Sequence, residues 1–160
     1  MTLEEQNIKI AKMREIRFVD CIEQIELYEK LNLELREANN INCIPDLCEI
    51  MEDTAYNCSA IEGVLETILV LINKNDTKKA IDKVIEGTPK MEGHANDWAE
   101  MLHSQLLRDD SIRYAYIECV KRADEANKRA VLTVLNKIKE KKWVKDLDIE
   151  AIISSIMRSL

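Results

Sequence analysis

The chain contains few of the residues that usually divide a sequence into short elements. Its 160 residues include three glycines, two prolines and seven aromatic residues. Turns are normally built from glycine and proline, so this shortage favours helices joined by short polar links over a sheet. Three scattered glycines also exclude a glycine-rich phosphate-binding loop.

Residues that carry catalytic or metal chemistry are also scarce. The only histidines, His94 and His103, are nine positions apart, which places them on no common helix face. Glu100 and His103 form one Glu-x-x-His pattern, but a di-iron bundle needs a second copy, which the chain lacks. We therefore predict that the protein is not an enzyme and has no catalytic residue, metal site or cofactor.

The five cysteines, Cys21, Cys43, Cys48, Cys58 and Cys119, form no C-x-x-C pair. Each lies within or beside a helical apolar pattern, which predicts buried free thiols in a reducing cytosol. The first twelve residues do not have the pattern of a signal peptide. No apolar run approaches the length of a membrane span. We therefore expect a cytoplasmic protein with no membrane contact.

The apolar residues that are present repeat with the period of a helix. The clearest case is a predicted central helix that begins after Asn57 or Ser59. Its apolar positions are Ile61, Val64, Leu65, Ile68, Leu69 and Ile72, and Val70 and Leu71 widen the band. The width of this band predicts that the helix lies at the centre of the fold. A short helix at about residues 45–52 precedes it, with Pro45 at its first turn.

The same periodicity predicts helices along the rest of the chain. They are expected at residues 3–37 as one helix or two, from a cap at Asp76 to Gly87, from a cap at Asn96 or Asp97 through Leu106, from a cap at Asp109 or Asp110 through Val120, at about 124–141 and at about 148–158. Residues 88–95 form the longest expected loop. We predict an all-α single domain spanning residues 1–160. Its seven or eight antiparallel helices are expected to form a bundle or a short HEAT-like stack.

Charge is distributed unevenly along the chain, whose net charge is −7. The front half, about residues 13–72, is acidic, and residues 20–66 contain twelve acids and two bases. The tail, about residues 121–145, is basic, with nine bases and three acids. A charged helix face is usually only a solvated face. The acidic excess would nevertheless attract a basic partner and argues against nucleic-acid binding by this half.

Acidic residues gather around the predicted central helix. Glu62 and Glu66 lie one turn apart on a face that the apolar residues leave free. A break at residues 54–57 separates this helix from the acidic short helix, and a convex tip there could enter a cleft. Each carboxylate taken singly could either keep its helix solvated or contact a partner, and both roles stay open. The clustering of the carboxylates favours contact with a partner. The predicted contact residues are Asp46, Glu49, Glu52, Asp53, Tyr56, Glu62 and Glu66.

One block of sequence resembles a known family. Asp97-Trp98-Ala99-Glu100-Met101-Leu102 is followed by a polar break and another short helix. Upstream lie Ile44-Pro45-Asp46-Leu47 through Glu52-Asp53, and then Ser59 to Leu71. Over roughly residues 44–140, this pattern resembles small helical immunity proteins of bacterial polymorphic toxin and contact-dependent growth inhibition systems. Trp98 itself is expected to pack at the start of its helix, with a partner contact as the alternative.

The resemblance implies a cytoplasmic protein without catalysis that binds the C-terminal toxic domain of a cognate effector. Many such toxins are nucleases with cationic clefts, and an acidic helical surface can occupy such a cleft as a phosphate mimic. We therefore expect a basic partner domain, with a nuclease favoured, and no nucleic-acid or membrane partner. A helical adaptor or scaffold that binds a host-cell protein stays open as the alternative.

A first prediction follows from the composition. Far-UV circular dichroism should give a mostly helical spectrum that neither a reductant nor a chelator changes, because no disulfide or metal is needed for folding. A large loss of helix after either reagent would contradict the prediction.

Overall fold

The computed structural model describes residues 1–158, which contain helices and connecting segments but no strand. In chain order the elements are α1 (Leu3–Glu15), α2 (Ile22–Ala38), the 3₁₀ helix η1 (Ile41–Cys43), α3 (Ile44–Ile50), α4 (Cys58–Lys74), α5 (Thr77–Gly87), the 3₁₀ helix η2 (Thr88–Met91), α6 (Asn96–Arg108), α7 (Asp110–Arg122), α8 (Glu125–Lys141) and α9 (Ile149–Met157). The all-α prediction is confirmed. Residues 159 and 160 of the predicted single domain lie outside this description.

The described residues form nine α-helices, more than the seven or eight expected, because the stretch at residues 3–37 divides into two. Between α1 and α2, Val19 has a φ of +43°, a left-handed conformation that a β-branched residue rarely adopts. The Val19 side chain is fully buried, so tertiary packing holds this strained residue in place. The reversal lets α1 and α2 run antiparallel, with an ion pair between Lys9 and Glu34.

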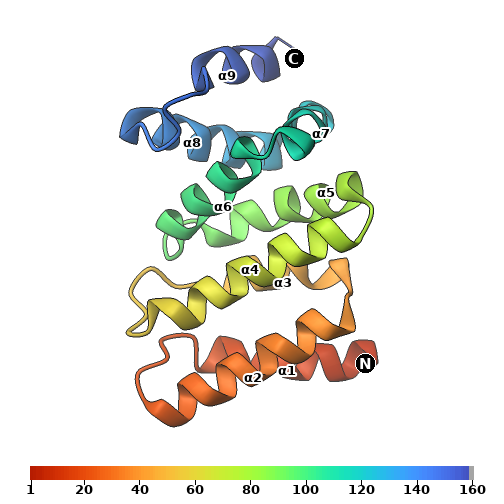
Figure 1. Cartoon of the computed structure of the whole chain (residues 1–160), viewed down its shortest axis with the longest axis vertical. Coiled ribbons are helices and arrows are strands. Elements are labelled where there is room, and N and C mark those ends of the chain that lie inside the picture. Colours follow the sequence, from red (N-terminus) through yellow and green to blue (C-terminus); the bar gives the residue numbers. More distant parts are fainter. Residues whose placement is uncertain (159–160) are drawn as a thin grey trace.

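Most helices pack against the helix two places further along the chain, which produces a stack of two layers (Figure 1). The odd-numbered helices follow one another in one layer, while α2 packs on α4 and α6 packs on α8 in the other. Between these two pairs, η2 contacts α3, α5 and α8. Among residues 1–158, no helix combines the length and the apolar character that a membrane crossing requires.

The apolar helix α4 buries one face and leaves the other open. Its buried residues are Ala60, Ile61, Val64, Leu65, Thr67, Ile68, Leu71 and Ile72. Leu69 and Val70 are only partly buried, so α4 does not occupy the centre that its sequence predicted. Helix α5 packs tightly against α3 at its C-terminal end. A Cβ added at Gly87 would come 2.8 Å from the Cys48 sulfur.

The predicted burial of the five cysteines is confirmed for three of them. Cys43, Cys48 and Cys119 are buried free thiols, and burial raises the pKa of Cys43 and of Cys48 to about 12. Cys21 and Cys58 are exposed, which corrects the prediction for these two. They stand at the amino-terminal ends of α2 and α4, before the buried face of either helix has begun.

A buried chain of hydrogen bonds ties α5, η2, α6 and α7 together around His103. Thr88 donates its hydroxyl proton to the Val84 carbonyl oxygen (2.9 Å) and lies 3.0 Å from His103 Nε2. The Tyr116 hydroxyl lies 2.7 Å from His103 Nδ1. These partners fit a neutral ring that donates from Nε2 and accepts at Nδ1. Complete burial lowers the pKa of His103 to about 4.

This network predicts a loss of stability in mild acid. His103 must stay neutral in the fold, whereas its pKa of about 6.5 in the unfolded chain lets it bind a proton there. Its contribution is therefore complete above about pH 6.5 and is lost as the pH falls towards about 4. The free energy of unfolding should fall by roughly 2 kcal/mol between about pH 7 and pH 5 on this account. Urea unfolding of the wild type and of His103→Gln at both pH values measures it, since the variant should lack this component. An equal fall in both proteins would contradict the assignment.

Candidate functional site

The seven predicted contact residues divide into an engaged group and an exposed group. Asp46, Glu49, Glu52 and Asp53 belong to α3 and the loop after it, where each has partners within the protein. Tyr56 lies in the same loop just before α4, Glu62 and Glu66 lie on α4, and all three are exposed. The two groups have different electrostatic environments, so they are taken in turn.

Asp46 and Glu49 are partly neutralised by bases from other elements. Lys90 of η2 lies 3.1 Å from Asp46 and 3.7 Å from Glu49, and Arg14 of α1 lies 3.0 Å from Glu49. These side chains keep roughly a third of their surface exposed, so the pairs contribute little stability. Their main effect is electrostatic, because Arg14 and Lys90 cancel much of the charge that α3 carries.

Glu52 is inside the protein, with only 4% of its surface exposed. Its carboxylate accepts hydrogen bonds from the Thr54 backbone N–H (3.1 Å) and the Thr54 hydroxyl (2.8 Å). Arg17 Nε lies 3.4 Å from the same carboxylate. The side chain therefore fixes the loop between α3 and α4 and has almost no surface left for a partner.

Asp53 caps a helix that begins 43 residues later in the chain. Its carboxylate accepts hydrogen bonds from the backbone N–H of Asp97 (3.2 Å) and of Trp98 (3.4 Å) at the start of α6. Ala95 at the N-cap position of α6 provides no side-chain cap, which corrects the prediction that Asn96 or Asp97 caps this helix. A carboxylate at a helix amino terminus is favoured both as an acceptor and by the helix dipole.

Trp98 reinforces the same junction. Its indole N–H donates to the Glu52 carbonyl oxygen at 3.2 Å, and only 8% of the residue is exposed. His94 contributes a ring contact of 2.8 Å between Nε2 and the Glu49 carbonyl oxygen. The expected packing role of Trp98 therefore agrees with its burial.

The exposed group lies on the loop before α4 and on the outer face of that helix. Tyr56 is 84% exposed. Glu62 is exposed and forms no ion pair with any described residue. Glu66 keeps 61% of its side chain exposed and lies 3.6 Å from Arg36 of α2. These three are the predicted contact residues that lie exposed to a partner.

The structure adds a row on α2 that the sequence analysis did not select. Ile22, Glu26, Glu29 and Leu33 follow one another at intervals of four, three and four residues, and all four are exposed. This spacing places them on one side of α2. Glu29 is seven residues before Arg36, and thus shares the side from which Arg36 reaches α4. The spacing was visible in the sequence, but only the packing shows that α4 lies beside it.

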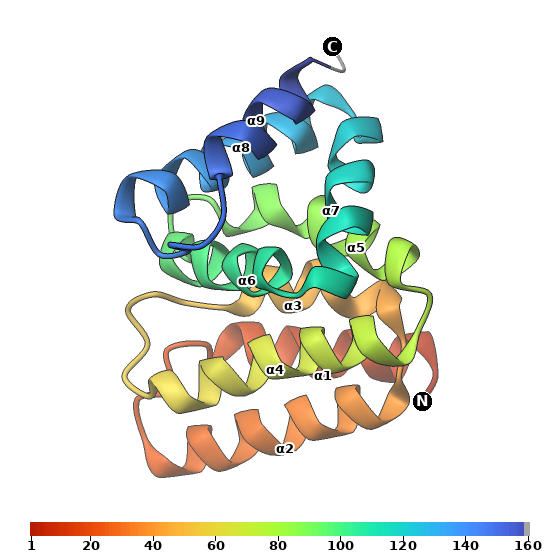
Figure 2. The ribbon, with the colours of Figure 1, turned by 45° about the horizontal axis from the view of Figure 1, so that its top comes forward.

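Two helices therefore share one acidic surface, defined here as the acidic face: Glu26 and Glu29 of α2 with Glu62 and Glu66 of α4. Figure 2 shows α2 and α4 side by side, and the two helices pack together. Arg36 joins them by donating to the Thr67 hydroxyl (2.9 Å) and to the Gly63 carbonyl oxygen (3.2 Å). Among residues 1–158, Glu26, Glu29 and Glu62 have no ion-pair partner, so the face keeps most of its negative charge.

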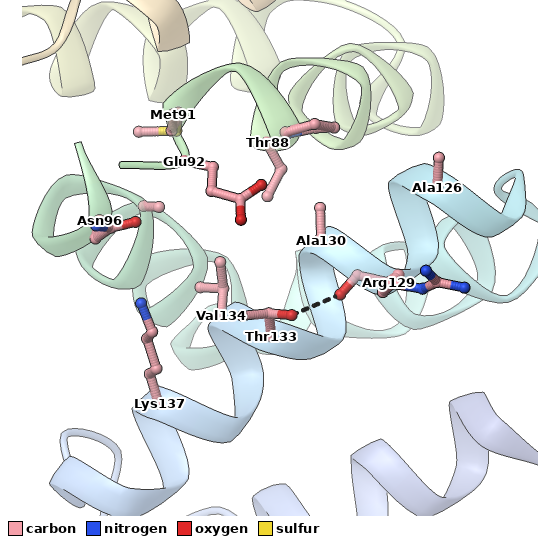
Figure 3. Close-up of a pocket in the computed structure, with 12 residues that line it drawn as sticks. Thr88, Met91, Glu92, Asn96, Ala126, Arg129, Ala130, Thr133, Val134 and Lys137 are labelled. Atoms are coloured by element: carbon pink, nitrogen blue, oxygen red, sulfur yellow. Dashed lines mark hydrogen bonds between the residues drawn. The ribbon is translucent and has the colours of Figure 1, made fainter. Parts of the chain in front are cut away.

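A pocket of about 340 Å³ lies elsewhere, between η2, the start of α6, and α8 (Figure 3). Met91, Ala130 and Val134 form part of its apolar lining, while Glu92, Arg129 and Lys137 carry its charges. The described residues that line it include no histidine, cysteine or aspartate. Across residues 1–158, no three side chains of the His, Cys, Asp and Glu types come together in a way that could hold a metal. None of the predicted contact residues reaches this pocket.

Comparison with protein families matches most of the chain to a known family. The model of the family described as Immunity protein 30 matches residues 15–116. This range contains α2 to α6 and therefore includes the acidic face and the junction between Asp53 and α6. No curated protein and no solved structure matches the chain.

Removing a carboxylate from one group or from the other should affect the stability of the fold differently. Glu52→Ala should lower the free energy of unfolding by about 2–3 kcal/mol, because it leaves Thr54 and Arg17 without their buried charged acceptor. Glu62→Ala is the matched control and should leave the free energy of unfolding nearly unchanged, because Glu62 is exposed and unpaired. Urea unfolding of both variants measures the difference, and equal stabilities would show that Glu52 does not hold the loop.

Proposed function

The chain belongs to the Immunity protein 30 family, and from this premise we propose that it neutralises one cognate bacterial toxin through the acidic face. Family membership confirms the resemblance to immunity proteins and implies a toxin as the partner. The toxin's chemistry and the contact surface are the parts that we propose. No specific observation favours the alternative of an adaptor for a host-cell protein.

The observation that carries the proposal is the difference between the two groups of carboxylates. The acidic residues of α3 and its loop form ion pairs with Arg14, Arg17 and Lys90 or accept hydrogen bonds from the start of α6. The carboxylates of the acidic face are exposed, and Arg36 is the one base paired with them among the described residues. Unpaired charge on one surface attracts an oppositely charged partner over a long range and raises the association rate.

The arrangement of these carboxylates supports a nucleic-acid-binding cleft as the target. Within each helix two carboxylates are three or four residues apart, which corresponds to about 4.5–6 Å along the axis. Packed helix axes are separated by about 8–10 Å, so α2 and α4 offer two parallel rows of charge. Successive phosphates of one strand advance by about 3.4 Å along the nucleic-acid axis. One turn of an α-helix rises about 5.4 Å, which is between one and two of these phosphate steps. A nuclease domain with a basic cleft fits this pattern.

Inhibition by this route is stoichiometric and requires no catalysis or cofactor from the immunity protein. The acidic face would occupy the substrate cleft and exclude nucleic acid from it. We place this action in the cytoplasm, where the substrates of such a nuclease are found.

The proposal is tested by reversing charge on the acidic face. Glu62→Lys together with Glu66→Lys should keep the fold, because neither side chain belongs to the buried face of α4. The association rate with the cognate toxic domain, sought among the genes next to this one, should fall at least about tenfold at 0.1 M salt. The wild-type rate should itself fall steeply towards 1 M salt, because the screening length shrinks from about 10 Å to about 3 Å. Stopped-flow association, with the toxic domain catalytically inactivated, measures both effects.

A matched control separates a local effect from a change of net charge. Glu125→Lys together with Glu140→Lys alters the net charge by the same amount, on α8 and outside the matched range. This control should protect cells that co-express the active toxic domain, whereas the double variant in α4 should not. Full protection by the α4 variant with unchanged affinity would refute the proposed contact surface. Failure of the wild type to bind the toxic domain would refute the function itself.

A further inference from the structure

The acidic face continues into an apolar cluster at the loop end of α2 and α4. Nine large hydrophobic side chains are exposed among the described residues, and three of them belong to this end: Phe18 at 44%, Ile22 at 69% and Tyr56 at 84%. The Tyr56 backbone N–H donates to the Phe18 carbonyl oxygen at 3.0 Å, so the two loops are in direct contact. Single exposed apolar residues need no explanation, but a contiguous group marks an interaction surface.

In the unbound protein, contacts from within the fold already hold the two loops that carry this cluster. The buried Glu52 carboxylate binds Thr54, and the Ala55 backbone N–H donates to the Glu52 carbonyl oxygen at 3.3 Å. On the other loop, the Arg17 guanidinium pairs with Glu52 and lies 5.2 Å from the centre of the Phe18 ring. A loop fixed by such contacts loses little conformational entropy when its exposed side chain becomes buried in a partner.

The cluster and the acidic face are continuous in sequence and in space. Ile22 starts the row on α2 that continues to Glu26 and Glu29, and Tyr56 lies just before α4, which carries Glu62. A partner that covers one therefore reaches the other. The charge of the acidic face requires basic residues beside the pocket that would receive an apolar side chain.

We propose that Tyr56, flanked by Phe18 and Ile22, is the apolar anchor that enters a pocket of the same toxic domain and determines how slowly the complex dissociates. This inference rests on the proposed function. It assigns different tasks to neighbouring groups: long-range charge on the acidic face accelerates association, and the buried aromatic side chain limits dissociation. Glu52 acts as a positioning residue behind the anchor.

The test compares two exposed tyrosines. Tyr56→Ala should increase the dissociation rate of the complex with the inactivated cognate toxic domain by at least about 30-fold, as expected for loss of a central aromatic contact. Its association rate, the salt dependence of that rate and its melting temperature should remain those of the wild type. Tyr114→Ala removes a side chain that is 72% exposed on α7 and should dissociate at the wild-type rate. Tyr56→Phe, which keeps the ring, should stay within about threefold of the wild type.

Each other result has a distinct meaning. If Tyr56→Ala dissociates at the rate of Tyr114→Ala while the charge reversal in α4 slows association, the anchor is wrong and the proposed acidic contact stands. If Tyr56→Ala and the α4 reversal both bind like the wild type, both assignments fail. Absence of binding by the wild-type protein overturns the proposed function and this inference together.

Discussion

The junction between the loop after α3 and the start of α6 joins the two halves of the chain. The Asp53 carboxylate caps α6, and the Asp53 backbone N–H donates to the His94 carbonyl oxygen at 2.8 Å. The Trp98 indole and the His94 ring add contacts to the carbonyl oxygens of Glu52 and Glu49. A helix amino terminus leaves backbone donors unsatisfied, and here the carboxylate of Asp53, remote in sequence, accepts from two of them. The position of α6 in the stack depends on these contacts.

The contacts of this region also change which of the acidic residues in the sequence remain unpaired. Counting charges from residue 20 to residue 66 omits Arg14 and Arg17 just before this window and Lys90 beyond it. These three bases pair with Asp46, Glu49 and Glu52. The negative charge that remains available lies on α2 and α4. The acidic face is therefore narrower than the acidic front half, and it is shifted towards the N-terminal end of the stack.

The packing of the helices in the stack determines which residues form the acidic face and which lie next to it. Because α4 packs beside α2 in the same layer, carboxylates separated by more than thirty residues in sequence share one surface. The same packing brings the loop before α2 against the loop before α4. Buried polar contacts around Glu52 support those loops from within. A hydrogen-bonded loop end next to a charged helical face fits the binding that we propose.

The sequence by itself determined the helical class, the approximate extent of most helices and the family. Asn57, Asp76 and Asp148 each cap the helix that follows, and each accepts a hydrogen bond from an N–H three residues on. Such local bonds depend only on adjacent residues, so the sequence pattern reveals them. Tertiary structure alone decided that Asp53 caps α6, that Glu52 is buried, and that α2 supplies half of the acidic face. These features depend on which helices become neighbours, a choice made by packing among residues far apart in the chain.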